Sequence, residues 1–434
     1  MALPQIVIVG GGAGGLVLAT RLASRLAKRG LADILLVDVN LTHVWKPLLH
    51  EIAAGTLNVA EDAVFFLSHA SSHGFRFIQG RMDRLERETK EIVLAAIPGI
   101  EGHGAIPERR IPYDTLVLAY GSVSNDFGVE GVKQHCVFLD GQRQAESLQQ
   151  RILYDCLQVH AVAGPEGPPP MRIAIIGAGA TGVELSAELH RATRQMVSYG
   201  LDRIDPDRDV KLTLIEAAPR VLPALPERLS EATEAQLRQL GVDILTAEQV
   251  SQVTPAGVHM RSGRFVPAEL KVWCAGIKAP EVATRLDGLE TDRMGRILVD
   301  QNLQAKGDLN IFALGDCAAS VPRNGDKPVP PRAQAAYQQA LALSRTLVNR
   351  YRGGQPVPFD YKDYGSLISL SYSAVGSLMG NLMGTVNIEG KLARMAYVSL
   401  YRKHQLAVHG MIWLVLTTAS RFIARGTRPR LKLH

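Results

Sequence analysis

A glycine-rich segment near the start of the chain has the residue types and spacing that bind a dinucleotide. It follows an apolar run at residues 6–9, and its positions are Gly10, Gly12, Ala13, Gly14 and Gly15. In this pattern the first glycine permits a tight turn, the second lets the backbone approach a pyrophosphate, and the last lets a helix pack closely on a strand. The free N–H groups at the helix N-terminus favour the phosphate charge. Asp38 ends the next apolar run, at about the 20-residue separation expected of an acid that binds a ribose hydroxyl pair.

A second segment repeats this chemistry. An apolar run at residues 172–176 precedes Gly177, Gly179, Thr181 and Gly182, and a later run at residues 210–215 ends in Glu216. The acid comes later than usual, which we attribute to a loop insertion in the polar stretch 199–209. One such motif alone also occurs at ordinary glycine turns in α/β proteins. Two of them, each followed by an apolar run that ends in an acid, predict that one chain binds two dinucleotides.

Each motif needs a strand, a turn and a helix to position it. The apolar pattern predicts a strand at 5–9, a helix at 16–29 and a strand at 33–37 around the first motif. A helix that begins near Val183 follows the second motif. The proline-rich stretch 164–170 lies just upstream and predicts a domain boundary. We therefore expect an α/β protein with two Rossmann-like domains.

Composition excludes several other classes. The chain has 434 residues, of which 46% are hydrophobic and 21% charged, so it is neither disordered nor a polytopic membrane protein. Its four cysteines form no C-x-x-C pair and no metal-type spacing. His69 and His73 are four residues apart but lack a third ligand pattern, so no metal is expected. The N-terminus has no basic region, and no signal peptide is expected.

Positive charge is concentrated at the C-terminal end. Residues 391–434 contain nine Lys or Arg and no acid, whereas the preceding 390 residues contain 39 basic and 42 acidic groups. Nucleic-acid binding is therefore not expected. The apolar run 405–420 is 16 residues long, below the roughly 18 to 20 needed to span a bilayer. Basic residues flank this run on both sides, which predicts a helix at an anionic membrane surface, with a dimerisation helix as the alternative. Residues 364–388 are expected to form strands and turns.

The order of further segments resembles the two-dinucleotide-domain flavoprotein reductases. These segments are residues 116–122, which contain Ala119 and Gly121, and residues 311–318, which contain Gly315 and Asp316. The resemblance implies that the first glycine loop binds FAD and the second binds NADH, and that Asp316 contacts the FAD ribityl chain. It also implies a discontinuous FAD domain. Tyr120 stands where that family usually has threonine.

The segment at residues 43–51 indicates the subfamily. Disulfide reductases of this fold need a redox cysteine pair beside the flavin, and no cysteine lies in this segment. The segment instead resembles that of type II NADH dehydrogenases. Lys46 could place a cation near the FAD phosphates, and Pro47 could hold the chain rigid against the flavin ring. The alternative is that this segment is an ordinary surface loop in which Lys46 has no specific partner.

Three more segments resemble the type II family. Ala333, Gln334 and Gln338 match its quinone-side motif, on a helix that Pro330 and Pro331 are expected to open. The two glutamines are four residues apart and share a helix face, where their amides could donate to a quinone or to the flavin edge. Ala275 and Gly276 match a strand end that contacts nicotinamide, and Cys274 is expected to be a buried filler. Glu184 matches a glutamate near the hydride-transfer site, with helix charge compensation as its alternative role.

The resemblance to the type II family implies a respiratory NADH:quinone oxidoreductase that binds FAD non-covalently, reduces a membrane quinone (ubiquinone or menaquinone) and pumps no protons. The expected domains are 1–125 with 296–345 for FAD, 126–295 for NADH, and 346–434 as a membrane-associating or dimerising C-terminal domain. The enzyme is expected at the cytoplasmic face of the cell membrane, as a peripheral protein. The alternatives are a soluble NAD(P)H oxidase or electron-carrier reductase of the same fold, and a non-enzymatic NADH-sensing protein.

Overall fold

The computed structural model describes residues 2–99, 103–162, 170–371, 373–380, 384–423 and 431. The chain forms two compact units, each built from separate stretches of sequence. The first consists of Met1–Trp45, Ala63–Val123 and Lys278–Lys362, and the second of Lys46–Asp62, Ser124–Ile277 and Asp363–His434. The stretch from Asp363 onward therefore clusters with the second unit instead of forming a third one. Which cofactor each unit binds remains a prediction, and most of the predicted linker 164–170 lies outside the described residues.

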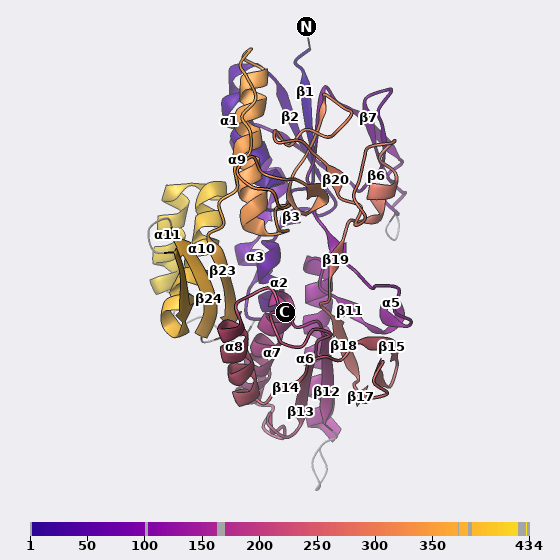
Figure 1. The fold of residues 1–434 in the computed structure, drawn as a ribbon, viewed down its shortest axis with the longest axis vertical. Helices are drawn as coiled ribbons and strands as arrows, with labels where there is room; N and C mark the ends of the chain where they lie inside the picture. The colour runs from indigo at the N-terminus through magenta and orange to yellow at the C-terminus, as the bar shows by residue number, and fades with distance from the viewer. Residues whose placement is uncertain are drawn as a thin grey trace. The chain divides into compact units, whose positions relative to one another are not determined.

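A five-stranded parallel sheet forms the centre of the first unit (Figure 1). Its strands, in spatial order, are β21 (Ile311–Ala313), β9 (Thr115–Leu118), β1 (Gln5–Val9), β2 (Asp33–Asp38) and β5 (Arg76–Gln79). Ile6, Val7 and Ile8 are fully buried, as expected of a parallel strand that is covered on both faces. Helix α1 (Gly15–Arg25) connects β1 to β2 and packs beside α9 (Ala333–Arg350).

The remaining elements of the first unit are short. They are α4 (Phe66–His73), the antiparallel sheet β6 (Met82–Glu86), β7 (Glu91–Leu94) and β8 (Arg109–Pro112), the strand pairs β3 (Thr42–His43) with β4 (Val64–Phe65) and β20 (Ile297–Leu298) with β22 (Ala318–Ala319), and the turns η1 (Ala27–Arg29), η3 (Glu281–Thr284) and η4 (Gly315–Cys317). The strands β10 (Val123–Ser124) and β19 (Ile277–Lys278) lie where the chain passes from one unit to the other.

The second unit repeats the parallel sheet. Its strands, in spatial order, are β11 (Val137–Phe138), β18 (Leu270–Trp273), β12 (Met171–Ile176), β13 (Val210–Ile215) and β14 (Asp243–Leu245). Helix α7 (Ala180–Ser198) connects β12 to β13, as α1 does in the first unit. The other elements are η2 (Lys46–Leu48), α2 (Leu49–Ala53), α3 (Val59–Asp62), α5 (Val132–His135), α6 (Gln142–Val162), α8 (Glu227–Gln239) and the antiparallel sheet β15 (Val250–Thr254), β16 (Gly257–Met260) and β17 (Phe265–Pro267).

An antiparallel sheet and two helices complete the second unit. The sheet contains β23 (Gly365–Leu370), β24 (Ser373–Gly380) and β25 (Gly384–Glu389), which confirms the strands expected in this stretch. Helices α10 (Gly390–His409) and α11 (Met411–Ile423) follow, and α10 packs on the sheet (Figure 1). Within the described residues, no helix is both long enough and apolar enough to cross a bilayer.

Two expectations about helices are wrong. The apolar run 405–420 is not one helix, because Gly410 has a φ of +84° and separates α10 from α11. Such a left-handed residue ends a helix, and glycine adopts it without steric cost. Helix α9 begins at Ala333 after an extended Arg332, so Pro330 and Pro331 precede its first turn and do not occupy it.

Candidate active site

Both glycine loops make the same turn between a strand and a helix. Gly10 has a φ of +105° and its N–H donates to the Val37 carbonyl at 2.7 Å. Gly177 has a φ of +102° and its N–H donates to the Ile215 carbonyl, also at 2.7 Å. Each turn is therefore fixed to the end of the neighbouring strand that bears the acid, and glycine is favoured there because other residues rarely adopt a positive φ.

Neighbouring backbone closes each turn tightly. A Cβ on the first glycine would lie 2.3 Å from the Ala119 oxygen in one unit and 2.8 Å from the Ala275 backbone in the other. A Cβ on Gly15 or on Gly182 would lie 1.8 Å or 2.0 Å from the carbonyl oxygen of that first glycine. Real Cβ atoms do not approach so closely, so each helix can begin against its own turn only at a glycine.

The middle of each loop is open. An added Cβ on Gly12 or Gly179 would meet no atom within 4 Å. A phosphate could therefore approach the bare backbone there, next to the first N–H groups of a helix. Gly14 differs, because a Cβ on it would lie 2.9 Å from the Ala336 oxygen of α9. Both loops fit a dinucleotide, and α9 covers the side of the first.

Asp38 holds the first loop in place. Its Oδ2 accepts the Gly11 N–H at 2.7 Å and its Oδ1 accepts the Asn40 N–H at 2.8 Å. Burial raises the pKa of this carboxyl, and these hydrogen bonds oppose the rise. His43, which is buried, lies with Nδ1 2.8 Å from the Gly11 oxygen. Sequence reasoning did not single out His43 as a support of this loop.

Glu216 repeats this arrangement in the second unit. Its Oε2 accepts the Ala178 N–H at 2.7 Å, and its Oε1 accepts the N–H two residues further on at 2.8 Å. Arg220 donates to the carbonyls of Pro223 and Leu225 at 3.1 and 2.9 Å. That cation is therefore bound within its own loop.

A buried glutamine fixes the late Gly-Asp segment. Gly315 has a φ of +75°, and its N–H donates to Gln339 Oε1 at 2.7 Å. Gln339 is 1% exposed and its Nε2 also donates to Ser320 Oγ at 2.7 Å. Asp316 accepts the Ser122 hydroxyl at 2.8 Å. The sequence did not indicate a role for Gln339, because its partners Gly315 and Ser320 are distant along the chain and only the fold brings them together. His43 escaped notice for the same reason.

The two motif glutamines lie in the first turns of α9. Gln338 Nε2 donates to the Lys362 carbonyl at 2.8 Å, and its Oε1 accepts the Lys362 N–H at 3.0 Å. Because a primary amide has two N–H groups and two acceptor lone pairs, Gln338 keeps one of each for another partner. Gln334 lies one turn earlier on the same helix. The predicted role of both in quinone binding stays a prediction.

The segment after β18 is shaped by an indole and a glycine. Trp273 Nε1 donates to the Asn125 carbonyl at 2.8 Å. Gly276 has a φ of +62°, and a Cβ on it would lie 2.4 Å from the Phe127 ring. Cys274 is partly buried and not a fully buried filler as expected. Loss of contact with water raises the pKa of its thiol to about 12, so this thiol stays protonated near neutral pH and is no nucleophile.

Glu184 lies in a buried group of ionisable residues in the second unit. It is 6% exposed, its Oε1 accepts the Ser369 N–H at 2.9 Å, and its Oε2 lies 3.4 Å from His50 Nδ1. Burial, with repulsion from Glu51 and Glu188, raises the pKa of Glu184 to about 8, against the lowering effect of the Ser369 bond. The first turn of α7 contains no acid, which disfavours simple charge compensation as its role.

The neighbours of Glu184 share its unusual environment. Burial, with repulsion from Glu188, raises the pKa of Glu51 to about 7, whereas burial and Arg394 lower the pKa of His50 to about 3. Glu188 is fully buried and its Oε2 lies 3.4 Å from the Thr56 hydroxyl. Glu188 could have been found from sequence, because it lies one turn after Glu184 on one helix face.

Lys46 and Pro47 form the short turn η2 that leads into α2. Helix α2 supplies His50 and Glu51 to the buried group, so this segment also positions part of that group, which Lys46 and Pro47 alone do not indicate. Their predicted contacts with FAD stay predictions.

The chain is similar to proteins of one enzyme family. A family model described as Pyridine nucleotide-disulphide oxidoreductase matches residues 4–340. A Type II NADH:quinone oxidoreductase of Haemophilus influenzae is 42% identical over 100% of both chains, and one of Staphylococcus aureus is 30% identical over 87% of this chain and 90% of the relative. The NDH2 structure from Plasmodium falciparum in complex with NADH superposes with a TM-score of 0.81, at 19% identity, over 99% of both chains.

If the first loop binds FAD, Gly12→Ala should lose flavin without losing the fold. The added methyl has open space around it in the protein alone, but it would stand where the phosphates approach the backbone. We expect at least about tenfold weaker FAD binding and an unchanged thermal midpoint of the flavin-free protein. Gly104→Ala adds a methyl to similarly open space outside the glycine loop and should change neither the FAD affinity nor the thermal midpoint. Full flavin content in purified Gly12→Ala protein would contradict the assignment.

Glu216 should make the enzyme prefer NADH over NADPH, because its charge repels an additional ribose phosphate. We expect kcat/KM for NADH to exceed that for NADPH by at least about tenfold, and Glu216→Gln to narrow the difference. Glu234→Gln is the control, because Glu234 is a partly exposed acid on α8 that pairs with Arg238. Equal efficiencies of the unmodified enzyme with the two nucleotides would show that Glu216 does not select between them.

Proposed function

The chain belongs to the type II NADH:quinone oxidoreductase family, and on that premise we propose how its residues divide the work of transferring electrons from NADH to a quinone. The observation that supports this function most strongly is the 42% identity to the Haemophilus influenzae enzyme over the full length of both chains. The repeated dinucleotide turn, once in each unit, agrees with a reaction that needs both a flavin and a nicotinamide nucleotide.

The glycine loop of the first unit would bind FAD, and the glycine loop of the second unit would bind NADH. The residues proposed for FAD are Gly10, Gly12, Ala13, Gly14, Gly15, Asp38, Lys46, Pro47, Ala119, Gly121, Gly315, Asp316 and Ala333. Those proposed for NADH are Gly177, Gly179, Thr181, Gly182, Glu216, Ala275 and Gly276. When bound, FAD accepts a hydride from NADH and passes two electrons to the quinone. The loops position the phosphates, the two acids bind the ribose hydroxyls, and Asp316, held by Ser122, binds the ribityl chain.

Proton balance gives Glu184 a role. Reduction of a quinone by NADH consumes one proton beyond the hydride, and that proton has to come from water through the protein. Burial raises the pKa of Glu184 to about 8, so the carboxyl is mostly protonated at neutral pH. A general acid works best when its pKa is near the working pH. We assign Glu184 as the group that holds this proton, and Gln334 and Gln338 as the quinone-side amides.

Half-reactions test the function. NADH should bleach the flavin under anaerobic conditions, and a soluble quinone analogue should then restore the flavin absorbance with saturation kinetics. Oxygen or an iron–sulfur carrier as the better acceptor would favour the alternative reductases of this fold. An absence of any flavin reduction by NADH would favour a non-enzymatic NADH-sensing protein.

Gln334→Ala and Gln338→Ala should slow the second half-reaction and leave the first largely unchanged. A lost hydrogen bond to quinone predicts a decrease of roughly tenfold. Gln134→Ala, an exposed glutamine on α5, should change neither step. If flavin stays bound and neither step changes in the α9 variants, the two glutamines have only a structural role.

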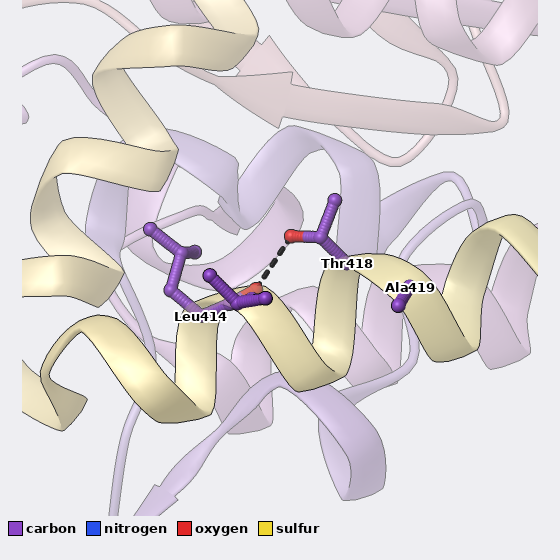
Figure 2. A pocket seen from close by; sticks show the side chains of 4 residues that line it. Leu414, Thr418 and Ala419 are labelled. Atoms are coloured by element: carbon purple, nitrogen blue, oxygen red, sulfur yellow. Dashed lines mark hydrogen bonds between the residues drawn. The ribbon is translucent and has the colours of Figure 1, made fainter.

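We also propose a peripheral attachment at the cytoplasmic face of the membrane; the exposed apolar surface of the C-terminal helices supports the attachment itself. Helix α11 exposes large apolar side chains, among them Met411, Ile412, Val415 and Leu416, which are 58 to 79% exposed. A shallow hollow on this helix is lined by Leu414, Val415, Thr418 and Ala419 (Figure 2). The basic residues that follow, Arg425, Arg428, Arg430 and Lys432, lie outside the described residues. Apolar burial and attraction to anionic lipid would act together, and a homodimer is the competing use of the same surface.

Ending the chain after Gly410 should release the enzyme from anionic vesicles. This position keeps α10, whose Ala393, Tyr397 and Val408 are buried, and removes α11 with the tail. The shortened enzyme should keep its flavin and oxidise NADH with a soluble quinone, as measured by vesicle flotation and steady-state assay. Changing Arg425, Arg428 and Arg430 to Gln should weaken binding to anionic vesicles by about 3 kcal/mol, at ~1 kcal/mol per residue, and barely affect neutral ones.

Two outcomes would contradict membrane attachment through this segment. One is retention of the shortened chain on anionic vesicles, and the other is equal binding of the full chain to neutral and anionic vesicles. If shortening instead halves the mass in solution, α11 is a subunit interface.

A further inference from the structure

Helix α10 reaches the buried group around Glu184 through one cation. Arg394 Nη1 hydrogen-bonds the Ser369 hydroxyl, and its Nη2 lies 4.0 Å from Glu51 Oε1. The same guanidinium lies 5.6 Å from the centre of the Tyr397 ring. Ser369 in turn donates its N–H to Glu184 at 2.9 Å. Arg394 therefore acts on Glu184 through Ser369, and on Glu51 through charge.

The group brings several ionisable side chains into one buried space. They come from three helices: His50 and Glu51 from α2, Glu184, Glu188 and Arg191 from α7, and Arg394 and Tyr397 from α10. A further acid, Asp62 of α3, also raises the pKa of Glu51. Two buried atoms in it have no hydrogen-bond partner among the residues that the structure describes: His50 Nε2 and Glu188 Oε1. These atoms leave capacity for a proton or a water molecule in the group.

We propose that Arg394 is a positioning residue for the proton held by Glu184: it fixes Ser369 and offsets the charge of Glu51, so α10 sets the pH range over which the buried carboxyls release a proton. This inference rests on the proposed function, in which Glu184 holds the proton that quinone reduction consumes. The inference extends the site to helix α10, which lies after the segment 4–340 that matches the family model. From the sequence, this part of the chain was expected only to contact the membrane or a partner subunit.

The sign of the effect follows from charge. Arg394 lowers the pKa of Glu51 and of Glu188, and the Ser369 N–H lowers the pKa of Glu184. Removing the guanidinium should therefore raise the pKa of all three carboxyls. Their greater protonation weakens the repulsion on Glu184 and offsets part of that rise. The total number of protons in the group still increases, because loss of a cation disfavours every carboxylate beside it.

Infrared spectroscopy of the FAD-loaded enzyme measures this directly, since a protonated carboxyl has its own C=O stretching band. In the unmodified protein that band should fade as pH rises through about 8, the pKa of Glu184, and Glu184→Gln should remove its largest component. Arg394→Met should move the midpoint upward by about one pH unit, the effect of losing an opposite charge at this distance. Arg394→Lys keeps the charge and should leave the midpoint near that of the unmodified enzyme.

The alkaline limb of quinone turnover should move in the same direction in Arg394→Met. Arg194→Met is the matched control, because it removes a cation from α7 where the side chain is exposed and pairs with Asp207; its infrared midpoint and pH profile should match those of the unmodified enzyme. Infrared midpoints that coincide in the unmodified and Arg394→Met proteins would overturn the proposal, even if thermal stability falls. So would an equal shift in Arg394→Lys. Failure of quinone turnover in the unmodified enzyme would overturn the proposed function instead, and the infrared midpoints would still decide the role of Arg394.

Discussion

The contact between the start of a helix and the carbonyl of its own turn determines how both units are built. Gly15 and Gly182 sit so close to the preceding Gly10 and Gly177 carbonyls that a Cβ would overlap the oxygen at 1.8 and 2.0 Å. This approach places the helix N-terminus directly above the end of the central strand. The open backbone at the middle of the loop and the acid at the end of the next strand follow from that placement, because both lie around the same turn.

The second constraint is the cost of burying negative charge. Glu51 and Glu188 raise the pKa of Glu184, and Glu188 also raises the pKa of Glu51. Among the residues that the structure describes, Arg191 and Arg394 oppose this negative charge. A buried carboxylate without compensation is very unfavourable, so such groups become protonated instead. The arrangement therefore destabilises the folded chain but raises the pKa of all three carboxyls, and it keeps Glu184 mostly protonated at neutral pH. That property is useful in an enzyme whose reaction consumes a proton.

The sequence predicted the parts of this protein whose determinants are local. Both glycine loops, the acids Asp38 and Glu216 and the strands that bear them depend on short-range geometry, and the fold class, the family and the strands at 364–388 are confirmed. The sequence did not predict that Gly410 separates two helices within the apolar run 405–420. Hydropathy depends on side-chain polarity and contains no information about the left-handed backbone of a single glycine. Gln339 and Arg394 were missed because their partners, Gly315 and Ser369, lie 24 and 25 residues away along the chain. Only tertiary packing brings them together.

The two copies of the turn differ in how they are covered, and the difference suits their proposed ligands. In the first loop Gly14 is buried, and the Ala336 carbonyl of α9 lies 2.9 Å from the position of its absent Cβ. In the second loop Thr181, at the corresponding place, is exposed. A loop covered by a packed helix retains its ligand, since release requires that packing to loosen, whereas an exposed loop allows rapid exchange. FAD has to remain bound through every turnover, whereas the oxidised nucleotide NAD+ has to leave after each one. The same local fold therefore suits both proposed ligands, because α9 covers the first loop while the second loop is exposed at Thr181.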